Sequence, residues 1–174
     1  MPFHEIAEGT LVQFNLEGAL PIFQERYVSP QAGTVVLRGL FNQRAFLEPI
    51  GGERYRTLGP RKDKERLDKL AYPVVHLPDR TEVFRVLTPL HLDKEQTPQM
   101  RFTALLDDQY YVIKQVKAGD RGYEIWESME MERIVQVEPG GSLVPNLRVL
   151  YPVPALLVLL FPWLANQTIL YKQL

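Results

Sequence analysis

Apolar and polar residues alternate over much of this chain, which is the pattern of β-strands with one face buried and the other in water. Val12–Glu17 is the first example, because valine, phenylalanine and leucine alternate there with glutamine, asparagine and glutamate. Runs rich in β-branched and aromatic residues predict further strands. These cover residues 20–28, 34–40, 44–50, 53–57, 74–77, 82–87, 100–106, 109–117, 122–128 and 131–137.

Turn-forming residues separate the predicted strands. Gly51-Gly52 predicts a tight hairpin, because glycine adopts the positive φ that such turns require. Pro30–Gly33, Asp107-Asp108 and Ala118–Asp120 predict further turns. Thr88–Gln99 contains two prolines and predicts a loop.

One charged helix is predicted over Pro60–Ala71. A proline suits the first helical turn, where its missing N–H costs nothing, and two leucines and an alanine form a narrow apolar stripe at helical spacing. Asp63–Leu70 is also consistent with a solvated insertion. We therefore expect an exposed helical insertion at 60–71.

The apolar C-terminal segment, 149–174, differs in character from the rest. Val149–Ala165 is 17 residues long and carries no charge. A membrane-spanning helix needs about 20 apolar residues, and three prolines interrupt this run. A buried terminal strand or short helix is favoured, and a membrane anchor stays open as the alternative. Gln167–Lys172 predicts a closing strand.

These elements predict a mainly β fold (β-rich α+β). We expect an antiparallel meander that forms a barrel-like or two-layer sheet, with one or two short helices. The chain has 174 residues, and one core serves roughly 100–200 residues. The prediction is a single domain over 1–174.

Composition narrows the function classes. The formal net charge is −1. This value argues against a protein that binds nucleic acid through its overall charge, but it leaves a local basic patch open. The sequence has no cysteine, so disulfides, thiolate metal sites and a cysteine nucleophile are excluded. Met1–Thr10 lacks the features of a secretory signal, and a cytoplasmic location is expected.

No catalytic or metal-binding motif is visible. His4, His76 and His91 lie far apart without a second ligand at metal spacing, and His76 is expected to be a hydrogen-bonded core or edge residue. No serine lies in a Gly-x-Ser-x-Gly elbow, and no phosphate-binding glycine loop is present. We expect a protein that is not an enzyme and has no cofactor and no metal.

Charge is segregated along the chain. Gly51–Leu70 contains seven basic and four acidic residues, a net charge of +3, whereas Asp120–Glu138 contains six acids and two arginines. The acidic stretch is interpreted as a solvated face or a docking surface for a basic partner. Faces of opposite sign suit a subunit that lies between unlike neighbours.

The basic segment is the best candidate for partner contact. Tyr55 lies between Arg54 and Arg56, and an aromatic ring can stack on a base while guanidinium groups hold phosphates. The alternative interpretation is a hairpin followed by an exposed, salt-bridged helix. The residues predicted to contact a partner or RNA are Arg54, Tyr55, Arg56, Arg61, Lys62 and Lys64.

Two stretches carry a family resemblance. Arg38–Glu48, which leads into Gly52–Arg56, resembles the opening strand pair of the small accessory subunit of type III-D CRISPR effector complexes. Leu105–Tyr111 resembles the Asp-x-x-Tyr start of a strand in that family. The resemblance covers about a third of the chain. It implies a non-enzymatic subunit, assembled beside the backbone proteins of a crRNA-guided complex, with no catalytic residues.

Two functions follow as expectations. The first is a non-catalytic structural or accessory subunit of a multiprotein complex, such as a crRNA-guided type III CRISPR effector, that contacts protein neighbours and RNA. The alternative is a lipocalin-like protein that binds a small ligand or chromophore, since an eight-stranded barrel can hold one small molecule. Membrane contact is not favoured, but residues 149–165 leave it open.

Overall fold

The computed structural model describes residues 3–20, 24–39, 44–63, 69–89, 101–106, 108–116, 122–127, 129–140 and 144–165. Most of these residues lie in strands. The strands are β1 (Glu5–Ile6), β2 (Leu11–Val12), β3 (Asn15–Leu20), β4 (Gln24–Ser29), β5 (Gly33–Arg38), β6 (Arg44–Pro49), β7 (Tyr55–Thr57), β8 (Arg61–Lys62), β9 (Lys69–His76), β10 (Glu82–Pro89), β11 (Arg101–Leu106), β12 (Gln109–Gln115), β13 (Tyr123–Glu127), β14 (Arg133–Glu138), β15 (Asn146–Val149) and β16 (Val153–Pro154). The helix α1 spans Ala155–Val158, and residues 161–165 are helical as well.

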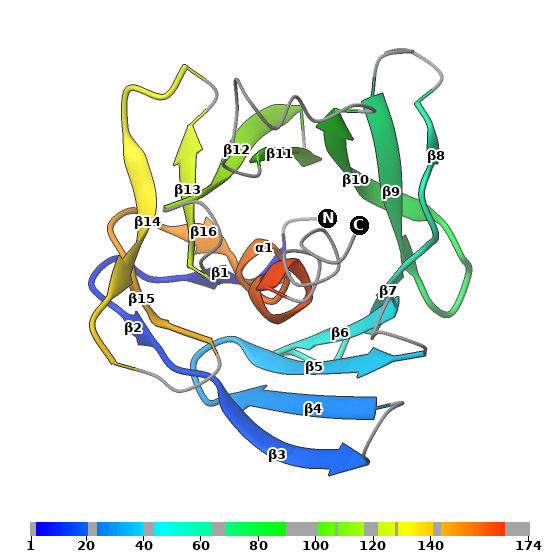
Figure 1. Ribbon diagram of the computed structural model, residues 1–174, viewed down its shortest axis with the longest axis horizontal. Coiled ribbons are helices and arrows are strands. Elements are labelled where there is room, and N and C mark those ends of the chain that lie inside the picture. Colours follow the sequence, from blue (N-terminus) through cyan, green and yellow to red (C-terminus); the bar gives the residue numbers. More distant parts are fainter. Residues whose placement is uncertain are drawn as a thin grey trace.

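One antiparallel sheet of 14 strands curls around a central space (Figure 1). Its order is β2-β15-β14-β13-β12-β11-β10-β9-β7-β6-β5-β4-β3, and β8 pairs with β9 beside this path. The edge strands β2 and β3 follow one another in the chain, but no pairing joins them among the described residues. The predicted mainly β meander is therefore confirmed, and the sheet is barrel-like without being closed into a barrel.

Alternation of side chains explains which side of β5 and β6 faces inward. In β6, Ala45 and Leu47 are buried, whereas Arg44 and Glu48 are exposed. The neighbouring β5 follows the same rule, with Val35 buried. Because successive side chains point to opposite faces of a sheet, these two strands present a buried apolar row to the interior and their other row outward.

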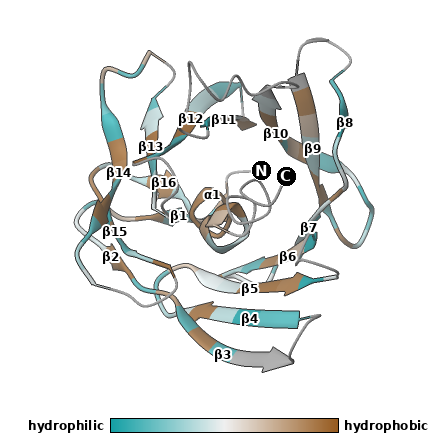
Figure 2. Cartoon of the chain, viewed as in Figure 1, coloured by the Kyte–Doolittle hydropathy of each residue, from teal (hydrophilic) through white to brown (hydrophobic). Residues whose placement is uncertain are grey.

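The C-terminal apolar segment occupies the interior. Figure 2 shows α1, mostly brown, inside the curled sheet, and every residue from 155 to 165 is buried. Trp163 packs edge-on against Tyr72 of β9, with ring centroids 5.1 Å apart. An unpaired charge would be costly there, which explains why Val149–Ala165 has none. The favoured prediction of a buried short helix is thus confirmed for residues 155–165.

The C-terminal apolar segment is also joined to the N-terminal part of the chain. Its β16 pairs with β1 in a separate two-stranded sheet (Glu5↔Pro154 and Ile6↔Val153), which ties the N-terminal strand to the start of α1. No helix within the described ranges has the length and apolar character needed to cross a membrane.

The predicted helix at 60–71 is wrong where the structure describes this stretch. Residues 61–62 form β8 and residues 69–71 begin β9, while residues 64–68 lie outside the described residues. Strand β9 pairs with β10 from Lys69 to Val75. This long antiparallel pairing outweighs a weak local helix preference, as tertiary contacts commonly do.

Other boundaries also differ from the predictions. Val12–Glu17 is not one strand, because β2 ends at Val12 and β3 begins at Asn15 on the opposite edge of the sheet. Strand β10 continues to Pro89 inside the predicted loop, and β15 was not predicted. Several predicted features lie outside the described residues: the loop at 90–99, Asp107, the turn at Ala118–Asp120, and the closing strand Gln167–Lys172.

Candidate nucleic-acid interface and a neighbouring pocket

The short strand β7 contributes to two surfaces at once. It lies between β6 and β9, with Arg56 opposite Phe46 and Val75, and Tyr55 opposite Leu47 and His76. Arg56 is only partly buried, whereas Tyr55 is buried. Because neighbouring residues of a strand point to opposite faces, Arg56 belongs to the outer face of the sheet and Tyr55 to the inner one.

On the outer face, arginines surround one aromatic ring. We call this surface the arginine face, and its members are Arg38, Arg44, Arg54, Arg56 and Phe46. The guanidinium carbons of Arg38 and Arg56 lie 4.9 and 5.3 Å from the centre of the Phe46 ring. Guanidinium groups are attracted to aromatic faces at this range, so the ring holds both side chains in place.

Most of the positive charge on this face is not neutralised. Arg54 is the exception, because its Nε lies 3.8 Å from Glu48 Oε1. Within the described residues, no carboxylate forms an ion pair with Arg38 or Arg56, and the buried Nε of Arg56 has no hydrogen-bond partner. A groove of about 400 Å³ runs beside these residues and is lined by Arg38, Phe46 and Arg54, among others. The arrangement can accept an anion.

The six residues predicted to contact a partner are not all brought together. Arg54 and Arg56 join the arginine face, whereas Tyr55 is only 6% exposed and lies on the opposite side of the sheet. Arg61 lies on β8, 3.5 Å from Glu82. Lys62 is exposed on the same strand, and Lys64 lies outside the described residues. The sequence pattern missed Arg38 and Phe46, which only strand pairing places beside Arg56.

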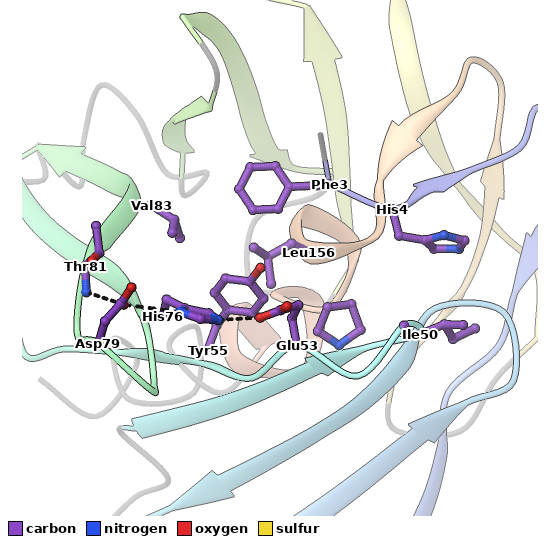
Figure 3. Close-up of a pocket in the computed structure, with 12 residues that line it drawn as sticks. Phe3, His4, Ile50, Glu53, Tyr55, His76, Asp79, Thr81, Val83 and Leu156 are labelled. Atoms are coloured by element: carbon purple, nitrogen blue, oxygen red, sulfur yellow. Dashed lines mark hydrogen bonds and ion pairs between the residues drawn. The ribbon is translucent and has the colours of Figure 1, made fainter. Parts of the chain in front are cut away.

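On the inner side, a pocket opens between the sheet and the start of α1. We call it the rim pocket. It has a volume of about 560 Å³ and is lined by Phe3, His4, Pro49, Ile50, Gly51, Glu53, Tyr55, His76, Asp79, Thr81, Val83 and Leu156. Figure 3 shows His4 and Ile50 at one end and Asp79 and Thr81 at the other, with Tyr55 between them.

A chain of three titratable groups crosses one end of the rim pocket. The His76 Nε2 contacts Glu53 Oε2, and Nδ1 lies 3.2 Å from Asp79 Oδ1 (Figure 3). The Asp79 carboxylate also accepts the Thr81 backbone N–H at 3.0 Å, which orders the β9–β10 turn. The hydrogen bond with Glu53 is the main cause that raises the pKa of His76, and the Thr81 backbone N–H lowers the pKa of Asp79.

This geometry favours ion pairing over proton transfer. Both ring nitrogens of His76 face carboxylates, so the protonated imidazolium donates two hydrogen bonds and has no nitrogen left to act as a base. The side chain of Glu53 is 50% exposed and that of Asp79 is 60% exposed, so water is not excluded from their carboxylates. No group of three metal-binding side chains is arranged around a common point among the described residues.

We expect the stability that His76 provides to depend on pH. Its pKa is raised in the folded state from about 6.5, and it faces Glu53, Asp79 and Tyr55. The His76 contribution is therefore fully present below about pH 6.5, while both carboxylates stay charged, and is lost as the pH rises through the folded pKa. The Tm difference between wild type and His76→Gln should shrink over that rise. A difference that stays constant with pH would contradict this assignment.

The acidic stretch predicted from the sequence is largely paired within the sheet. Arg133 lies 3.1 Å from Glu124, Lys114 lies 3.4 Å from Glu130, and Arg148 lies 3.3 Å from Glu138. Lys114 and Arg133 also flank Trp126, at 4.3 and 5.0 Å from its ring. This outer face is therefore a network of mixed charge rather than a free acidic surface.

Comparison of the chain with protein-family models, with curated proteins and with solved structures found no match.

Proposed function

We propose that this protein is a non-catalytic accessory subunit of a multiprotein complex and that it contacts RNA through the arginine face. The observation that carries the proposal is the pair Arg38 and Arg56, held over Phe46 without a carboxylate partner among the described residues. Guanidinium groups bind phosphate oxygens through paired hydrogen bonds.

Single-stranded RNA is the form of nucleic acid that suits this face. Proteins that bind single strands combine a positively charged groove with aromatic or guanidinium planes on which bases stack. Here the groove, the Phe46 ring and the arginines occur together on neighbouring strands. The resemblance of Arg38–Glu48 to a subunit of crRNA-guided complexes points to the same ligand.

Contact with protein neighbours is supported by a second surface. Met129 and Met131, in the β13–β14 turn, are 74% and 80% exposed. Glu127 accepts the backbone N–H groups of both methionines and thereby orders this turn. Exposed methionines adapt to the surface of a partner, so this turn is our candidate for a protein interface.

The alternative of a lipocalin-like carrier has less support. Such a carrier holds its ligand inside the barrel, and in this protein the buried residues 155–165 occupy the interior. A small ligand would have to use the rim pocket instead.

We expect the Arg38→Gln/Arg56→Gln variant to bind a short single-stranded RNA at least about tenfold more weakly, because charged hydrogen bonds each contribute roughly 1.5–3 kcal/mol. Fluorescence anisotropy at several salt concentrations measures this. The logarithm of the affinity falls linearly with the logarithm of the salt concentration, and each lost phosphate contact should make this negative slope shallower by about 0.7. The matched control is Arg133→Gln/Arg148→Gln, which removes the same charge on β14 and β15, far from Phe46 in the strand order.

The control variant should bind RNA as the wild type does. Equal losses in both double variants would show that only net charge matters, and unchanged binding of Arg38→Gln/Arg56→Gln would remove the arginine face from RNA contact. Co-purification of the tagged protein with a ribonucleoprotein complex tests the subunit role. A lone monomer that carries neither protein nor RNA would contradict it.

A further inference from the structure

The rim pocket has features of a ligand site that the contact with RNA does not use. Its volume of about 560 Å³ falls within the roughly 300–1,000 Å³ of small-molecule sites. Such sites combine apolar walls with a few polar groups. Here the walls include Phe3, Ile50, Val83 and Leu156, which come from the N-terminal segment, the β6–β7 turn, β10 and α1.

The hydroxyl of Tyr55 has no hydrogen-bond partner within the described part of the chain, although Tyr55 is only 6% exposed. Figure 3 shows its ring in the middle of the pocket, between His76 and Glu53 and below Phe3. The rings of Tyr55 and Phe3 are tilted, with centroids 6.1 Å apart. The hydroxyl oxygen is not among the described polar atoms that are both buried and unpaired, so it is accessible from the pocket and available to a ligand.

The charges in the pocket select the sign of the ligand. Two carboxylates, Glu53 and Asp79, face the single imidazolium of His76, so the balance is negative. The Asp79 carboxylate is occupied by His76 and Thr81. In Glu53, Oε2 contacts His76 and Oε1 has no hydrogen-bond partner among the described residues. Since Glu53 and Tyr55 are two residues apart in extended chain, they point to the same side. Together they can accept hydrogen bonds from one cation.

We propose that the rim pocket binds a small organic cation, namely a protonated primary amine on a compact aromatic or aliphatic body. The ammonium group donates to Glu53 Oε1 and to the Tyr55 hydroxyl oxygen. The body lies against Phe3, Val83 and Leu156, where the aromatic rings also attract the positive charge. A phosphate or carboxylate ligand is excluded by repulsion from Glu53 and Asp79. This site does not depend on RNA contact, because none of its polar groups belongs to the arginine face.

Calorimetric titration with phenethylamine tests the proposal on the full chain. We expect saturable binding, with phenethyl alcohol at least tenfold weaker and phenylacetate not bound. The Glu53→Gln variant should lose at least tenfold in affinity for phenethylamine, and Tyr55→Phe severalfold. The control, Glu48→Gln, removes the same charge from the outer face and should bind as the wild type does.

Three results with these ligands and variants would overturn the proposal, and a fourth with a peptide. The first three are absence of phenethylamine binding to the folded wild type, equal affinity for phenylacetate, and equal effects of Glu53→Gln and Glu48→Gln. Binding of a lysine-containing peptide without binding of phenethylamine would also overturn it and would indicate a protein contact at this pocket. Tyr55→Phe keeps the ring and its packing, so a selective loss in that variant supports the site even if Glu53→Gln loses stability.

Discussion

The Trp163→Ala variant is expected to lose about 3–5 kcal/mol of unfolding free energy, the range for removal of a large aromatic side chain from a core. Trp163 is fully buried inside the curled sheet and packs on Tyr72. Its loss would leave a cavity between the C-terminal segment and β9. Because small domains are stable by only about 5–15 kcal/mol, this one change removes a large part of the total.

Urea unfolding followed by circular dichroism measures this effect. The matched control is Tyr151→Ala, because Tyr151 lies in the same C-terminal segment but is 47% exposed. That variant should change the unfolding free energy by less than about 1 kcal/mol. If Trp163→Ala does not fold, Leu157→Ala gives the same test at about 2–5 kcal/mol. Near-zero effects of both core variants would contradict the placement of residues 155–165 in the core.

The second large effect is expected at Gly33, where β5 begins. Its φ is +134°, and a Cβ added there would lie 2.3 Å from the Glu48 carbonyl oxygen and 2.8 Å from the Pro49 Cα. Both neighbours are backbone atoms of β6, which pairs directly with Gly33, so neither can rotate away. We expect Gly33→Ala to cost roughly 3–5 kcal/mol, from an unfavourable backbone conformation and overpacking together.

Gly52→Ala is the matched control for this prediction. Gly52 also has a positive φ, +92°, but a Cβ there would have no atom within 4 Å. It should therefore cost only the backbone term, about 1–2 kcal/mol. Urea unfolding of both variants separates the clash from the backbone conformation. Equal losses in the two variants would mean that the close approach of β5 and β6 at Gly33 does not matter.

The sequence pattern did not predict which side chains meet at the candidate sites. Arg54 and Arg56 stood out because they flank an aromatic residue, but Tyr55 takes the opposite face of β7 and packs 5.3 Å from His76, centre to centre. The aromatic ring beside Arg56 is Phe46, ten residues earlier in the chain. Its role follows from the pairing Phe46↔Arg56. The predicted hairpin at Gly51-Gly52 already paired the strand of Phe46 with that of Arg56, but the sequence did not give the register that puts these two residues opposite each other.

No local sequence pattern indicated the rim pocket. Glu53 and His76 are 23 residues apart, and they meet because β7 pairs with the end of β9. His76 was predicted to be hydrogen-bonded, but a sequence with three scattered histidines does not indicate which carboxylates lie beside one of them. The apolar walls come from four separate segments, including α1.

The sequence by itself determined the strand character of most segments, the inward or outward direction of their side chains, and the need to bury an uncharged C-terminal stretch. These properties are local, because they follow from period-two alternation and from the cost of exposing apolar residues to water. Only the tertiary structure decided that 60–71 contributes strands rather than a helix, that α1 lies within the curled sheet, and which side chains meet at the arginine face and the rim pocket. Register between strands depends on backbone pairing over long separations, and many pairings satisfy the same alternation.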